Sequence, residues 1–277
     1  MRTVLQKLLH PGLSQLIRER GYSQVGGSVV RAGDAKNLRT ADALRQAYGW
    51  PSEASGYVDV VRFEVPLCAT VSVPPQVERP WPSYPLGFLR PVGDEIVPVW
   101  NMTTTRYSPG AELWRITDAG EQEILAVYRG AAHGWTALQG QQPIKEWHPS
   151  SRFFGTRAVF EEIEYASDIR DDQVDLTSYV EPASAGWSQA RLGVWTKTVP
   201  LAACTVYELD FTASLGDVPV RVLEEHNGVV RAQFLTDDPE ISGRLSAVMV
   251  DYGVFEVSGI PGIDLSDTKL LANQLVH

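Results

Sequence analysis

Residues 112–128 have the pattern of a β-hairpin, and this pattern restricts the fold more than any other feature of the chain. Two strand-like segments, 112–116 and 121–128, lie on either side of a Thr-Asp-Ala-Gly turn. Gly120 ends the turn, at a position that needs a positive φ and therefore favours glycine. Further strand-like segments occur at residues 57–65, 218–223 and 229–234. We therefore predict an α+β, β-rich protein.

Helix signals are confined to short segments, each with a capping residue or a Gly/Pro stop beside it. They are residues 2–20 with a break at Pro11, 41–48 after a cap at Thr40, 239–243 after a cap at Asp238, and 266–275 after a cap at Ser266.

The charge of the chain divides it into two parts. Residues 1–150 hold 15 Lys/Arg against 14 Asp/Glu, whereas residues 151–277 hold 9 against 20. We predict an aromatic-rich, mixed α+β module over 1–150 and an acidic module of small antiparallel barrel-like or sandwich-like units over 151–277. The acidic part repels phosphates and anionic lipids, so we expect no nucleic-acid or membrane partner.

The acidic module contains a weak internal repeat, with units at about 157–203 and 204–265. Phe160-Glu161 and Tyr207-Glu208 open the two stretches. Gly-Val-Trp followed by Pro200 closes the first, and Gly-Val-Phe followed by Pro261 closes the second. The sequence leaves open whether these units are a true duplication.

A run of carboxylates is the strongest functional indication. Eight acidic residues fall within 161–181, opposed only by Arg170. Such a run is typical of a solvated loop, but it also fits a docking face for a basic protein. The predicted face contains Glu161, Glu162, Glu164, Asp168, Asp171, Asp172 and Asp175.

A second predicted binding element is the segment 74–91, which holds six prolines. Proline excludes this segment from a helix interior and from a central strand. Trp81 and Tyr84 on such a rigid frame would make a binding anchor, or they would pack back onto the module.

Common catalytic motifs are absent from the sequence. It has no P-loop, no GxGxxG and no GxSxG, and Gly26-Gly27 is too short to indicate a phosphate-binding loop. The histidines lack metal-ligand spacing, and Cys68 and Cys204 are too few for a thiolate zinc site. We therefore predict neither a metal nor a cofactor.

One arrangement nevertheless resembles the arginine, hydroxyl and Glu-x-Glu triad of ADP-ribosyltransferases. Arg31 ends a predicted strand at 28–31, three threonines at 103–105 follow a predicted strand at 97–100, and Glu121-Gln-Glu123 opens a third. The resemblance implies that Arg31 holds the NAD pyrophosphate and that Glu123 stabilises the ribosyl cation.

Other segments resemble proteins of actinobacterial polymorphic-toxin loci. Residues 25–35, 38–44 and 59–66 are similar to the opening of toxin domains, some of them NAD-directed. Residues 109–116, 221–223 and 237–239 resemble proteins encoded near such toxins, which implies an immunity or accessory role.

These observations give three hypotheses. The first is a non-enzymatic immunity or accessory factor that occludes a basic toxin with its acidic face. The second is an NAD-dependent transferase or glycohydrolase-like toxin domain that uses Arg31, Glu121 and Glu123. The third is a structural component of a larger assembly. Because Gln6, Lys7 and His10 interrupt an apolar signal core, we expect the chain in the cytoplasm.

Overall fold

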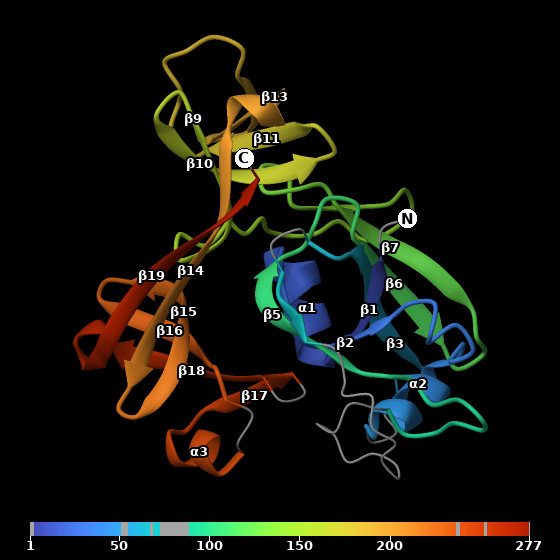
Figure 1. Ribbon diagram of the computed structural model, residues 1–277. Helices are drawn as coiled ribbons and strands as arrows, with labels where there is room; N and C mark the ends of the chain where they lie inside the picture. The colour runs from blue at the N-terminus through green and yellow to red at the C-terminus, as the bar shows by residue number, and fades with distance from the viewer. Residues whose placement is uncertain are drawn as a thin grey trace. The chain divides into compact units, whose positions relative to one another are not determined.

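The computed structural model describes residues 3–50, 55–66, 69–72, 89–236, 239–251 and 254–276. They form two compact units (Figure 1). Unit 1 comprises Met1–Arg129 with Gly134–His148, and unit 2 comprises Gly130–His133 with Pro149–His277. An antiparallel sheet is the basis of each unit, so the predicted α+β, β-rich class is confirmed.

Unit 1 has an eight-stranded sheet in the order β4-β5-β2-β1-β3-β6-β7-β8. Its elements are β1 (Val4–Leu8), α1 (Pro11–Arg20), β2 (Gln24–Arg31), α2 (Ala41–Tyr48), β3 (Tyr57–Glu64), β4 (Val71–Ser72), β5 (Trp100–Arg106), β6 (Glu112–Thr117), β7 (Gln122–Tyr128) and β8 (Trp135–Ala137). The predicted hairpin is confirmed as β6 and β7, and Gly120 between them has a φ of 84°. One core, with Phe63, Tyr107 and Trp135 among its aromatic residues, joins the sheet to α1.

The two helices of unit 1 begin and end as local sequence chemistry requires. The Thr40 hydroxyl accepts the Ala43 N–H at 3.1 Å, which caps α2 as predicted. Helix α1 ends at Gly21, with Arg18 and Arg20 in its last turn, where cations interact well with the helix dipole.

The helix predicted over residues 2–20 is wrong for its first part, because Val4–Leu8 forms β1. β1 lies between β2 and β3 in the sheet, and its consecutive buried residues show that both of its faces are covered, so no alternation is visible in the sequence. Even Gln6 and Lys7 are buried, at 3% and 1% exposure. The Lys7 ammonium donates to the Gly26 and Ser28 carbonyls at 2.8 and 3.3 Å, which satisfies it inside the core.

Gly26-Gly27 lies inside β2, where the pairing register with β5 shifts between Val25 and Gly27. A Cβ at Gly26 would lie 2.3 Å from the Thr104 Oγ1 atom and 2.7 Å from the Thr104 Cα atom. The glycine therefore permits two strands to approach closely at a bulge.

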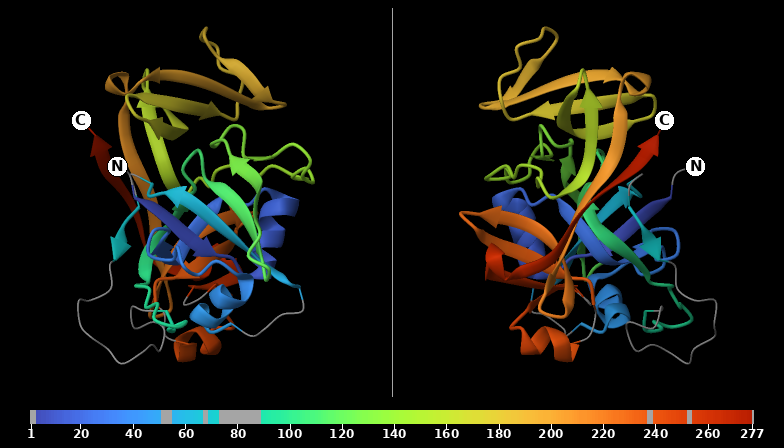
Figure 2. Two further views of the ribbon diagram at one scale, coloured as in Figure 1. Left: turned by 90° about the vertical axis from the view of Figure 1, so that its right-hand side faces the viewer. Right: turned by 60° about the vertical axis from the view of Figure 1, so that its left-hand side comes forward.

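Unit 2 is an eleven-stranded sheet in the order β12-β13-β11-β10-β9-β14-β15-β16-β18-β17, with β19 on β14 (Figure 2). Its elements are β9 (Phe154–Phe160), β10 (Ile163–Arg170), β11 (Gln173–Ser178), β12 (Ser188–Arg191), β13 (Val194–Pro200), η1 (Leu201–Ala203), β14 (Thr205–Leu215), β15 (Val218–His226), β16 (Val229–Phe234), α3 (Pro239–Arg244), β17 (Val248–Asp251), β18 (Val254–Pro261), η2 (Gly262–Asp264) and β19 (Leu265–Val276). Two separate cores lie along it, one centred on Val174 and Leu176 and one on Val220 and Phe234.

The strands of unit 2 follow the same order twice. In each repeat three strands form a meander. A hairpin follows, and its second strand pairs with the third meander strand. After a 3-10 turn, a long strand returns and pairs with the first strand of the meander. The first repeat runs from β9 to β14 and the second from β14 to β19, so that β14 belongs to both.

Matched hydrogen bonds support this equivalence. The first residue of each 3-10 turn donates its N–H to the hairpin turn of the meander, from Leu201 to the Asp172 carbonyl and from Gly262 to the Gly228 carbonyl, both at 2.7 Å. The prolines before these turns are equivalent too, since Pro200 pairs with Gln173 and Pro261 with Val229.

Two expectations for this unit are corrected. Phe160-Glu161 and Tyr207-Glu208 are not equivalent, because Glu161 lies in the turn after β9 whereas Glu208 lies inside β14. The helix predicted from Ser266 is the strand β19, since residues 265–276 pair with β14 along its length. The short helix predicted at Pro239 is confirmed as α3, and its predicted cap Asp238 lies outside the described residues.

Candidate functional site

The residues of the predicted NAD site lie apart within unit 1. Arg31 ends β2 and forms a two-pronged ion pair with Asp34, at 2.7 and 2.9 Å. Glu123 lies in β7, where it accepts a hydrogen bond from Gln141 at 3.1 Å. Three strands, β1, β3 and β6, separate β2 from β7 in the sheet.

Arg31 and Glu123 are also displaced along the strand direction. Arg31 pairs with Leu5 of β1, which pairs with Phe63 of β3. Glu123 pairs with Arg115 of β6, which pairs with Asp59 of β3. Four residues of β3 correspond to about 13 Å. The structure therefore does not bring these two side chains together around one dinucleotide.

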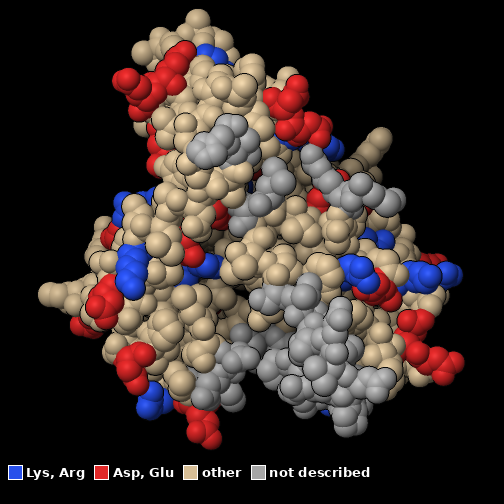
Figure 3. Space-filling view, in the orientation of Figure 1, with Lys and Arg blue, Asp and Glu red and all other residues tan. Residues whose placement is uncertain are grey.

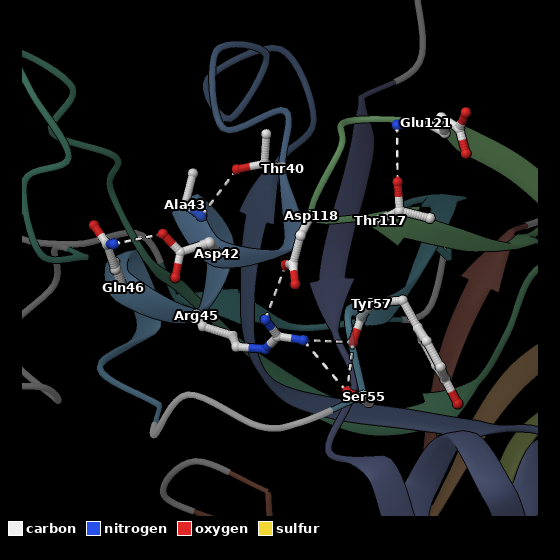
Figure 4. Close-up of polar contacts among 10 residues, drawn as sticks. All are labelled: Thr40, Asp42, Ala43, Arg45, Gln46, Ser55, Tyr57, Thr117, Asp118 and Glu121. Atoms are coloured by element: carbon white, nitrogen blue, oxygen red, sulfur yellow. Dashed lines mark hydrogen bonds and ion pairs between the residues drawn. The ribbon is translucent and has the colours of Figure 1, made fainter.

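The hydroxyl segment and Glu121 do not complete such a site. The strand predicted at 97–100 is wrong in position, because β5 begins at Trp100 and contains the three threonines. Thr104 and Thr105 are buried inside the unit. Glu121 donates its backbone N–H to the Thr117 hydroxyl, and its carboxylate points away from Arg45 (Figure 4).

The predicted acidic face is divided by the strand that it contains. Glu161 and Glu162 form the turn before β10, and Asp171 and Asp172 form the turn after it. β10 has eight residues, so the two turns are about 26 Å apart. Acidic side chains accordingly form separate groups on the face seen in Figure 3.

The other predicted carboxylates have partners inside unit 2. Glu164 lies 3.6 Å from Arg157 and accepts a hydrogen bond from the Tyr207 hydroxyl. Burial, together with this hydrogen bond, raises the pKa of Tyr207 to about 12.

Two aspartates of the run are buried. Asp168 accepts the Ala131 N–H at 2.7 Å, and Asp175 pairs with Arg170 and accepts the Thr198 hydroxyl at 2.6 Å. They face each other across β10 and β11, and these partners offset the repulsion of two like charges. The run therefore does not form one continuous face, because Asp168 and Asp175 are buried whereas the two turns and Glu164 are exposed.

The turn before β10 has an uncommon backbone conformation. Glu161 and Glu162 have φ values of 51° and 67°, in the left-handed region. Asn and Gly are the usual residues of such a two-residue hairpin turn, whereas a glutamate there costs on the order of 1 kcal/mol. The turn thus carries two negative charges at a cost in stability.

The predicted anchors Trp81 and Tyr84 lie outside the described residues.

Sequence reasoning missed a polar cluster beside a small cavity in unit 1. Asp59 in β3 is 4% exposed and accepts two hydrogen bonds from Arg115, at 2.9 and 3.0 Å. Ser14 of α1 donates its hydroxyl to the same carboxylate. Both residues line a cavity of about 60 Å³, together with Arg18, Arg45 and Tyr57 among others.

Arg45 forms the second half of this cluster (Figure 4). Its guanidinium donates to Asp118 at 3.0 Å, to the Ser55 hydroxyl at 3.3 Å and to the Tyr57 carbonyl at 2.8 Å. These bonds attach α2 to the β6–β7 turn and to the start of β3. Arg45 and Asp59 both form hydrogen bonds with other residues of the protein. The cluster therefore connects elements of the fold.

A different feature of unit 2 is open to a partner. β19 is twelve residues long and, among the described strands, pairs with β14 alone. β14 and β19 run side by side in Figures 1 and 2. The outer edge of β19 is therefore a row of backbone groups without a neighbouring strand in the described part of unit 2. Leu270 and Leu271 at its centre are 62% and 44% exposed.

Among the described residues, no three His, Cys, Asp or Glu side chains gather in a way that would hold a metal ion. No helix among these residues is long and apolar enough to cross a membrane. No known protein family, curated protein or solved structure matches the chain.

Proposed function

We propose that the protein is a non-enzymatic interaction protein that serves as a component of a larger assembly, and that it binds by strand addition at the outer edge of β19. The observation that carries this proposal is the length of that edge. Six of its twelve residues, 269–274, pair with β14 in unbroken register and offer enough main-chain groups for an additional strand of ordinary length.

The composition of β19 supports the proposal. Proteins protect exposed strand edges by keeping them short or by placing proline and several charges on them. β19 contains no proline, and Asp267 and Lys269 are its only charged residues. Bulges near Asp267 and Leu275 interrupt the ends of β19. Between them, residues 269–274 have no proline and one charge, so this part of the edge has the features of a docking strand.

Uptake of a strand can be measured with a labelled peptide. We expect a fluorescent peptide of the sequence Leu265–Val276 to bind the full chain saturably, with a dissociation constant on the order of 10–100 µM. Amide hydrogen exchange should slow in β19 when the peptide is present, because the added strand accepts its outward N–H groups. A scrambled peptide of equal composition is the control. Equal binding of both peptides, or no change in β19 exchange, would contradict the proposal.

The acidic turn at Glu161 and Glu162 favours a second candidate function. Two glutamates in the left-handed region lower stability, and strained backbone is concentrated at functional sites. This supports an immunity or accessory factor that meets a basic partner through this turn. The NAD-dependent transferase has no comparable support, because Arg31 and Glu123 lie apart.

The second candidate predicts opposite effects on stability and on binding. Glu161→Asn together with Glu162→Gly supplies the residues that the turn favours, so we expect stability to rise by about 1–2 kcal/mol in urea unfolding. The same change should weaken co-purification with the product of the adjacent gene. Asp217→Asn, in the equivalent turn of the second repeat, is the control for charge loss. Unchanged co-purification would remove the turn from the binding surface.

A further inference from the structure

The repeat in unit 2 indicates what occupies the outer edge of β19. β14 closes the first repeat as β19 closes the second. One edge of β14 carries β9 and β15, and its other edge is covered by β19 from residue 206 to 215. The closing strand of one repeat is thus covered by the closing strand of the next, in antiparallel orientation.

We infer that β19 pairs with β19 of a second copy of this chain, antiparallel about a two-fold axis. The inference rests on the proposed function and names its partner. In such a dimer, β19 of the second copy covers β19 of the first in the same way as β19 covers β14. A two-fold axis lets two identical strand edges pair with each other, and it leaves no unpaired edge at which further copies could add.

The sequence of β19 is compatible with this symmetry. A two-fold axis places one residue opposite itself, because paired residues of two antiparallel strands point to the same face. With the axis at Leu271, residues 269–273 of the two copies pair with each other, inside the stretch that pairs with β14 in unbroken register. Leu271 then lies opposite Leu271 of the second copy, and Leu270 lies opposite Ala272 on the other face.

The charges of β19 also permit the pairing. With the axis at Leu271, Asp267 falls opposite Leu275 and Lys269 falls opposite Asn273, so no like charges meet. The strand has no net charge, and two copies of it do not repel each other.

Sedimentation velocity of the full chain from 1 to 200 µM tests the inference. We expect a monomer–dimer equilibrium with a dissociation constant on the order of 10 µM, because one strand pair makes a small interface. Leu270→Lys/Leu271→Lys sets two lysines opposite each other at the axis and adds a charge on the other face, so it should weaken dimerisation at least tenfold. A mixture of Leu271→Lys and Leu271→Glu chains sets opposite charges against each other at the axis and should form the dimer, which tests the register.

The matched control is Val180→Lys/Leu192→Lys, which adds the same charge at side chains 75% and 95% exposed outside β19. It should leave the equilibrium unchanged, and circular dichroism checks that all variants fold. A monomeric wild-type chain at every concentration overturns the inference, as does a dimer that Leu270→Lys/Leu271→Lys leaves intact. If the chain is monomeric yet takes up the β19 peptide, the proposed function stands and only the second copy is excluded. If the chain is monomeric and does not bind the β19 peptide, both the proposed function and the inferred dimer are wrong.

Discussion

Gly26→Ala should destabilise unit 1 by about 3 kcal/mol, at the upper end of the cost of overpacking. The added Cβ would come within 2.7 Å of the Thr104 Cα atom, which belongs to backbone and cannot rotate away. β2 and β5 would have to separate at the bulge. That separation would also disturb the bond from Lys7 to the Gly26 carbonyl, which is 2.8 Å long.

Tryptophan fluorescence in urea measures this effect in unit 1, because six of the eight tryptophans lie between Trp50 and Trp147. Gly33→Ala is the control, since no atom lies within 4 Å of the position that its Cβ would take. We expect the control to change stability by no more than about 0.5 kcal/mol. A Gly26 variant as stable as the Gly33 variant would mean that β2 and β5 can shift at little cost.

Local chemistry made several parts of the fold predictable. The β6–β7 hairpin follows from the strand-like segments on either side of the turn that ends at Gly120, and α2 follows from the Thr40 cap and the glycine after Tyr48. These signals depend on residues close together in the chain, so a single sequence contains them.

β1 and β19 could not be predicted, and the reasons differ. β1 is buried on both faces, and Gln6 and Lys7 occupy positions where a buried strand ordinarily has apolar residues. In β19 the spacing of Leu270, Leu271 and Leu275 suggests a helix, although pairing with β14 makes the segment a strand. In both strands the neighbouring strand decides the conformation, and that neighbour is remote in sequence.

The candidate sites depended even more on remote contacts. In the sequence the acidic run suggests one face. In the structure the two acidic turns lie at opposite ends of β10, and carboxylates between them pair with residues such as Arg157. The Ser14–Asp59–Arg115 group combines residues from α1, β3 and β6, and no sequence motif indicates it. Spacing along the chain cannot reveal pairs that are 45 and 56 residues apart.

Asp59→Ala should destabilise unit 1 by about 3 kcal/mol, because it removes one partner of a largely buried ion pair. The Asp59 side chain is 2% exposed and that of Arg115 is 21% exposed. Burial opposes the charge on Arg115, but the hydrogen bonds and charge of Asp59 outweigh it and raise the pKa of Arg115 above its ordinary value. Without Asp59 the guanidinium keeps its charge and loses its partner, and the Ser14 hydroxyl loses its acceptor.

Two companion variants establish whether the cluster supports the fold or is a binding site. Asp59→Leu/Arg115→Met replaces both charges by apolar groups and should recover at least half of the loss, since it leaves no buried charge unpaired. Ser14→Ala should cost about 1 kcal/mol, as expected for one hydrogen bond. Residues kept for binding or catalysis often reduce stability, so removal of a functional group there raises it. If Asp59→Ala stabilises unit 1 in urea unfolding, the cavity beside it is a ligand site and the structural interpretation is wrong. The bidentate pairing with Arg115, at 2.9 and 3.0 Å, leads us to expect the opposite sign.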